Sequence, residues 1–201
     1  MWRLFRKIDS RNKGRGVLRR ALILFLIGGW LMGTVLMWVV ATQNFRRVDA
    51  VLANPRPEIK QRISPMTEGD ARLVLRLLAS ELNRFYFRAW GAAQLVLGGI
   101  LLALIWSTFR SDLRTCMLVG LMWGITAVLL FFIIPQLIHV GRQIDFVPRA
   151  PPPPQISIFW RLHLAYTLAD VVKLTLGFWA FIRLAKILSC SVLTKRSKDN
   201  L

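Results

Sequence analysis

The sequence predicts an all-α, polytopic integral membrane protein: a bundle of four transmembrane helices, with helices one and two extending outside the bilayer. Hydrophobic residues make up 55% of the 201-residue chain and charged residues only 19%. The apolar residues are gathered into long runs, as a membrane protein requires. The same composition excludes intrinsic disorder, a collagen-like fibre and a disulfide scaffold.

Four segments are long enough to cross the membrane. A helix that crosses about 30 Å of hydrocarbon needs about 20 mainly apolar residues. We expect such spans at residues 21–41, 89–109, 115–135 and 162–185, and the first and third contain no charged residue. The fourth has the right length, but a buried or interfacial helix is the alternative because of its polar residues, which are His163, Asp170, Lys173 and Arg183.

The first span also resembles the apolar region of a cleaved signal peptide. Basic residues precede it, and Val39 and Ala41 would suit a small-residue cleavage site. Its apolar run is longer than the roughly 7–15 residues of a signal peptide, so an uncleaved anchor is favoured.

Basic residues predict the orientation. The formal net charge is +18, and Lys and Arg are dense in residues 1–20 and in the tail, residues 186–201. Arg110 and Arg114 add charge between spans two and three. Since cytoplasmic segments carry an excess of Lys and Arg, we expect both basic ends to be cytoplasmic and to flank a transmembrane domain over residues 21–185. The localisation expected is the bacterial inner (plasma) membrane.

The connections between spans are not featureless. Prolines between residues 55 and 65 predict a break in the helical structure, because proline cannot continue a helix. Thr67 is a plausible N-cap for a long helix that runs to about Phe109, and the first helix is expected to continue to about Ala53. Residues 151–154 are four prolines, which favour a rigid spacer over a ligand for a proline-binding domain.

The fourth span contains the candidate intramembrane polar site. His163, Tyr166, Asp170 and Lys173 fall on one helix face at about 100° per residue. An ionised group at the bilayer centre costs about 2.5–3.5 kcal/mol, so Asp170 and Lys173 should face the bundle. Their spacing of three permits an ion pair. The pair could form a solute, ion or proton site, or it could only fix how the helix packs.

Other residues point to packing or to a cofactor. Gly29 with Gly33, and Gly120 with Gly124, have the small-xxx-small spacing of helix packing. His139 and His163 are weak candidates for a metal or haem, and interface hydrogen bonding is the default interpretation. We therefore expect no cofactor, with haem or a transition metal as the alternative.

Charge and motifs narrow the partners. The basic ends suit the anionic headgroups of the bilayer, and no nucleic-acid recognition motif accompanies them. Four spans are few for a transporter, so a homo-oligomer or a membrane-protein partner is expected. No nucleophile elbow, Walker loop or zinc-protease helix is present, which argues against an enzyme.

Three functions remain open at this point. The first is a membrane protein that handles a small solute, metal or proton through its bundle-facing polar site. The second is an assembly protein that binds an envelope partner through its outer helices. The third is a haem- or metal-dependent membrane oxidoreductase.

Several short segments together carry a resemblance to a known family. They are Ala-Thr-Gln-Asn-Phe at 41–45, Glu-Leu-Asn-Arg-Phe at 81–85, Pro135 with Gly141 and Arg142, and Leu162-His163 with Tyr166. Their order resembles the four-span membrane domain of unknown function related to transmembrane protein 205, over residues 22–185. The resemblance implies a small four-helix integral membrane protein without an established activity.

Overall fold

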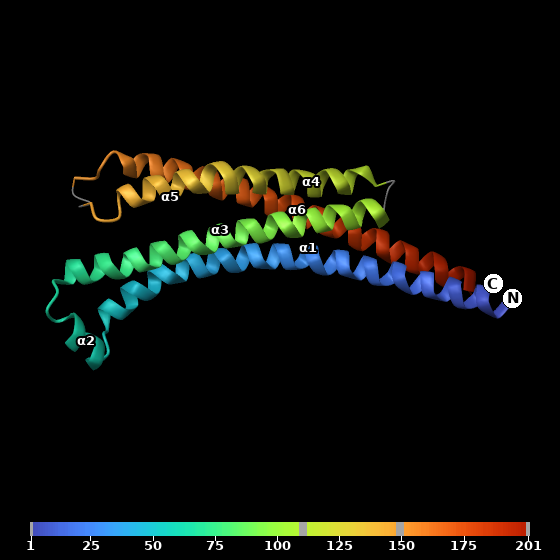
Figure 1. Ribbon diagram of the computed structural model, residues 1–201, viewed down its shortest axis with the longest axis horizontal. Helices are drawn as coiled ribbons and strands as arrows, with labels where there is room; N and C mark the ends of the chain where they lie inside the picture. Colours follow the sequence, from blue (N-terminus) through green and yellow to red (C-terminus); the bar gives the residue numbers. More distant parts are fainter. Residues whose placement is uncertain (1, 109–111, 148–150, 200–201) are drawn as a thin grey trace. The chain divides into compact units, whose positions relative to one another are not determined.

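The computed structural model describes residues 2–108, 112–147 and 151–199, with side chains at 16, 18–108, 112–147, 151–187 and 189. The described residues are mainly helical and contain no strand. In chain order (Figure 1) the elements are α1 (Trp2–Ala53), α2 (Pro57–Ile63), α3 (Glu68–Thr108), α4 (Leu113–Val128), the π-helical segment η1 (Leu129–Ile133), α5 (Ile134–Gln143) and α6 (Gln155–Asp199).

Three of the helical stretches in the described chain are long and apolar enough to cross a membrane. They are Leu18–Ala53, Glu68–Thr108 and Leu113–Gln143. They contain the first and third predicted spans and the second up to Thr108, since residue 109 lies outside the described residues. The all-helical class is thereby confirmed. The predicted fourth span is not among the three candidate spans. Its residues, 162–185, lie in α6. The charged and polar residues of α6 lower its apolar content.

Several helix ends match the sequence. Helix α1 continues to Ala53, and α3 begins directly after Thr67. The Thr67 hydroxyl oxygen accepts a hydrogen bond from the Asp70 backbone N–H at 3.1 Å and donates one to the Asp70 carboxylate at 2.7 Å. The basic ends are helical in the structure: α1 starts at Trp2 and α6 runs to Asp199. Their assignment as cytoplasmic segments stays a prediction.

The third span does not end at Pro135, as the sequence had suggested. The helix passes through Pro135 and continues to Gln143. The π-helical segment η1 lies directly before α5, which contains this proline. Proline lacks an N–H, and its ring would clash with the carbonyl four residues earlier in a regular α-helix. The wider π turn accommodates both the missing N–H and the proline ring, so the helix continues.

The chain divides into two compact units. The first contains Met1–Met32, Gln94–Thr126 and Asp170–Leu201, and the second contains Gly33–Ala93 and Ala127–Ala169. The first unit buries Ile23, Ile27, Trp30, Leu101, Ile105, Val119, Met122, Ala180 and Leu184. The second buries Ala71, Ala79, Leu129, Ile134, Ile138, Ile144 and Tyr166.

Large apolar side chains are also exposed along the helices. Phe25, Met117 and Phe131 are 75%, 73% and 62% exposed. A monomeric soluble protein rarely leaves so much apolar surface open to water. The distribution is typical of helices that face lipid.

The four glycines predicted to mediate packing have different surroundings. Gly33 lies against the indole ring of Trp90, which a Cβ atom would overlap. A Cβ on Gly29, Gly120 or Gly124 would meet no atom within 4 Å. In the first unit, close packing instead occurs at Gly98, where a Cβ would overlap the Trp123 ring. The Trp123 indole N–H donates to the Leu95 carbonyl at 2.9 Å, which holds this ring in place.

Gly98→Ala should therefore destabilise the protein, whereas Gly120→Ala should not. Overpacking of a core costs about 1–3 kcal/mol. Alanine at the open position Gly120 should be neutral or stabilising, because it favours the helix. Thermal unfolding of the two purified variants in one detergent would compare them. Equal melting temperatures would contradict the packing around Gly98.

Candidate functional site

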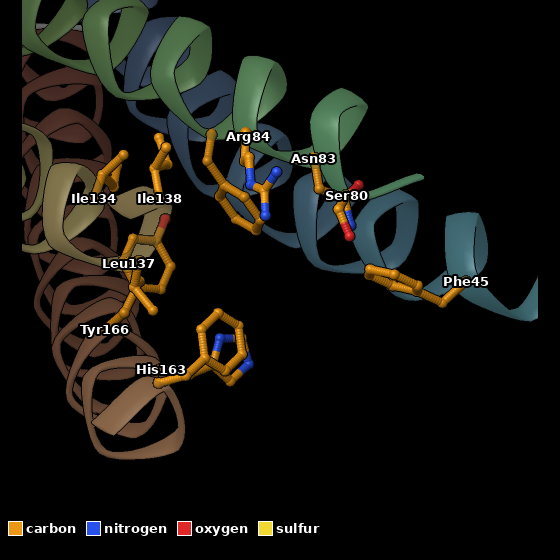
Figure 2. Close-up of a pocket in the computed structure, with 11 residues that line it drawn as sticks. Phe45, Ser80, Asn83, Arg84, Ile134, Leu137, Ile138, His163 and Tyr166 are labelled. Carbon is orange, nitrogen blue, oxygen red and sulfur yellow. The ribbon is translucent and has the colours of Figure 1, made fainter. Parts of the chain in front are cut away.

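A cavity of about 140 Å³ lies within the second unit (Figure 2). Its lining surface consists almost entirely of apolar atoms. Helix α1 contributes Phe45, and the remaining residues come from α3, α5 and α6: Ser80, Asn83, Arg84, Phe87, Ile134, Leu137, Ile138, Phe159, His163 and Tyr166. In Figure 2 the labelled side chains of α3 and α6 point toward the space between them.

A wider groove of about 540 Å³ shares part of this lining. It includes Phe45, Ser80 and His163 of the cavity and adds residues such as Leu77 and Trp160. His163 is exposed and Tyr166 is buried, so His163 lies at the open side. The second unit therefore contains a small apolar cavity and, beside it, a larger groove that shares part of its lining.

Two asparagines join α1 to α3 beside the cavity. The Asn44 amide N–H donates to Asn83 Oδ1 at 2.6 Å, and the Asn83 amide N–H donates to the Ala41 carbonyl at 3.1 Å. Asn83 is 8% exposed, so its polar atoms need partners inside the protein. These hydrogen bonds hold α1 beside α3 where Phe45 and Asn83 line the cavity.

Arg84 is the charged group of the cavity wall. Its Nη1 and Nη2 atoms donate to the two oxygens of Asp145 at 2.9 Å each, and Nη1 also donates to Glu81 Oε1 at 2.7 Å. The side chains of Arg84 and Asp145 are only 12% and 11% exposed. Such a bidentate pair fixes geometry as well as charge. It connects α3 to the turn after α5.

Gly141 allows this arrangement. A Cβ at this position would lie 3.1 Å from Arg84 Nη2 and 3.5 Å from the Phe159 ring. A residue with a Cβ would need the Arg84 guanidinium to shift by a few tenths of an ångström. The glycine therefore leaves room for the guanidinium beside α5.

Aromatic rings form the opposite wall. The His163 ring stacks on Phe159 with an interplanar angle of 8° and a centroid distance of 5.9 Å. Tyr166 meets Phe87 edge to face at 5.4 Å. These contacts are geometries that aromatic pairs prefer. The Phe87–Tyr166 contact joins α3 to α6, whereas the Phe159–His163 stack lies within α6.

Asp170 and Lys173 belong to the first unit, apart from the cavity lining. The Lys173 ammonium lies 2.6 Å from Asp170 Oδ1 and donates to Gln94 Oε1 at 2.7 Å. The Lys173 and Asp170 side chains are 2% and 3% exposed. The predicted ion pair is present and faces the protein interior. Gln94 is the partner from α3 that the sequence did not identify.

The predicted site is thus divided between the two units. His163 and Tyr166 line the cavity of the second unit, whereas Asp170 and Lys173 form a buried polar cluster in the first. A role of these four residues in function stays a prediction. The residues that the sequence did not single out are Glu81, Arg84 and Asp145. The spacing of three between Glu81 and Arg84 could have indicated their ion pair, but no local signal pointed to Asp145.

The two histidines line different spaces of the second unit. His139 lies beside Arg142 and Gln143, and its Nε2 is 3.1 Å from the Gln143 amide nitrogen. His163 stacks on Phe159 at the cavity. Within the described ranges, no group of three or more His, Cys, Asp and Glu residues could hold a metal ion. Metal or haem ligation by this pair stays an untested alternative.

Comparison with protein-family models, with curated proteins and with solved structures finds no match. The segments quoted for the family resemblance nevertheless meet in one place. Asn44, Asn83, Arg84, Gly141 and His163 all lie at or beside the cavity of the second unit.

Lys173→Met should destabilise the protein strongly. Removal of one partner leaves the Asp170 charge buried, which costs about 3–5 kcal/mol. Replacement of both groups, as in Asp170→Leu with Lys173→Met, should restore much of that stability. The matched control is Lys186→Met on the exposed side of the same helix, with an effect within about 0.5 kcal/mol. Denaturant unfolding in nanodiscs measures all three. A Lys173→Met variant as stable as the control would contradict the pairing.

Proposed function

We propose that this chain is a non-enzymatic four-span protein of the bacterial inner membrane that binds a small, neutral, mainly apolar molecule at the cavity of its second unit. The observation that carries the proposal is the apolar lining of a cavity of about 140 Å³. An apolar cavity of about 150 Å³ in another protein stays dry and binds benzene or xenon. A single ring or a short branched chain would fit here.

The charges near the cavity favour a neutral ligand. Arg84 and Arg142 are cationic, and Glu81 and Asp145 are anionic, so the four charges cancel. The Arg84 guanidinium already has two carboxylate partners. A metal ion or an inorganic anion would find no uncompensated charge in this group. Ser80, Asn83 and His163 could instead contact one or two polar atoms of a ligand.

The fourth span is part of the proposal. The two charged residues near the middle of the proposed span in α6, Asp170 and Lys173, are both 2% exposed. The same helix exposes a series of large apolar side chains, which are Leu164, Leu168, Val171, Val172, Phe178, Trp179 and Ile182. A helix whose charges face protein and whose apolar residues face outward can cross a bilayer as part of a bundle. The basic ends then favour cytoplasmic termini and an outward-facing cavity.

The alternative is an assembly role, which one observation favours. Val74, Leu78, Leu82 and Phe85 recur at helical spacing on α3 before the proposed span, and they are 38–65% exposed together with Leu73. An apolar stripe outside the bilayer suits a partner helix. The assembly role predicts no saturable ligand in the cavity, so photolabelling of the cavity separates the two functions.

A single-ring apolar diazirine photoprobe tests the ligand proposal. Labelling of peptides that contain Phe87 or Tyr166 should saturate and should be reduced by an excess of a non-reactive single-ring compound. Ser80→Leu fills the cavity and should weaken this labelling about tenfold or more. Ser107→Leu is the matched control, because Ser107 is exposed on the same helix and does not line the cavity. Labelling that never saturates, or that Ser80→Leu leaves unchanged, would contradict the proposal.

A further inference from the structure

A further groove lies in the first unit, between α4 and α6. It has a volume of about 640 Å³ and is lined by Arg114, Met117, Leu118, Leu121, Trp179 and Arg183. The four α4 residues have the i, i+3, i+4, i+7 spacing of one helix face. We call this space the cytoplasmic groove, since its arginines belong to the side of the chain that the basic ends assign to the cytoplasm.

The groove is polar at one end and apolar at the other. Arg114 is at the start of α4, and Leu121 lies seven residues further, or about 10 Å along the helix. On α6, Trp179 is one turn before Arg183. The apolar side chains are open to the surroundings: Met117, Leu121 and Trp179 are 73%, 54% and 55% exposed.

A carboxylate organises the polar end. Asp112 Oδ1 accepts from Arg183 Nη2 at 3.0 Å, and its Oδ2 accepts from the Thr115 hydroxyl at 2.5 Å. Burial raises the pKa of Asp112, but the hydrogen bonds from Thr115 and Arg183 outweigh this effect and lower it overall. The carboxylate is therefore ionised at neutral pH.

The groove retains one positive charge. Arg183 is neutralised by Asp112, whereas Arg114 is exposed and has no ion-pair partner among the residues that the structure describes. Two guanidinium groups and one carboxylate leave a net charge of +1. This charge is complementary to a single phosphodiester.

We propose that the cytoplasmic groove binds one anionic phospholipid, with its phosphodiester at Arg114 and Arg183 and an acyl chain along Met117, Leu121 and Trp179. The exposed apolar wall favours a lipid over a free anion, because a free anion would leave that surface uncovered. The proposal rests on the membrane insertion proposed above and does not depend on a ligand in the second unit.

Native mass spectrometry of the full chain would test this site. Phosphatidylglycerol and phosphatidylcholine with identical acyl chains are added at equal concentration, and the fraction of protein with one bound lipid is measured. The intact protein should prefer phosphatidylglycerol. Arg114→Gln should weaken its binding about fivefold, as expected for one basic residue near a headgroup. The control is Arg19→Gln, an exposed arginine of α1 in the same unit that does not line the groove.

Three results would overturn the proposal. The first is equal loss with Arg114→Gln and Arg19→Gln, which would indicate general charge attraction. The second is unchanged lipid selectivity in Arg114→Gln. The third is displacement of the lipid by millimolar inorganic phosphate, which would indicate a simple anion site.

Trp179→Ala should weaken the binding of both lipids. Size-exclusion profiles show that each variant is folded. Photolabelling of the cavity in the same samples separates this site from the ligand proposal.

Discussion

The structure depends on the pairing of charges that are withdrawn from solvent among apolar helices. Isolated charges in such surroundings are costly, and three cations on these helices each have a carboxylate partner. Lys173 pairs with Asp170, Arg84 with Asp145 and Glu81, and Arg183 with Asp112. Gln94 joins the first pair to α3, and the other two pairs join a helix to a residue just outside a neighbouring helix within the same unit.

The same constraint shapes the cavity. Because Arg84 is neutralised by carboxylates, the space that it lines is apolar in spite of a guanidinium in its wall. Gly141 permits the close approach, and the Phe159–His163 stack forms the other side. This combination is the reason that we propose a neutral apolar ligand for the cavity. The cytoplasmic groove differs, because it combines a net positive charge with an apolar wall.

Apolar run lengths predicted the helical class and three membrane-long helices, but they also predicted a fourth span in α6, which is not among those helices. The N-cap at Thr67 predicted the long helix that follows it. The sequence also predicted the Asp170–Lys173 pair, because a spacing of three is a local property of one helix. It did not predict Gln94 or Asp145 as partners, since these contacts join residues far apart in the chain. Nor did it predict the passage of the helix through Pro135, which depends on the π turn before that residue. Tertiary packing decides such features.

The proposed function combines an apolar ligand in the cavity with an opening of the cavity on the outer side of the membrane. The most direct measurement is labelling of the S80C variant, with Cys116 and Cys190 replaced by serine, using a membrane-impermeant maleimide on intact spheroplasts. We expect labelling without permeabilisation, slowed by a single-ring apolar compound, while the R114C variant reacts only after permeabilisation. Reaction of S80C only after permeabilisation would contradict an outward-facing cavity.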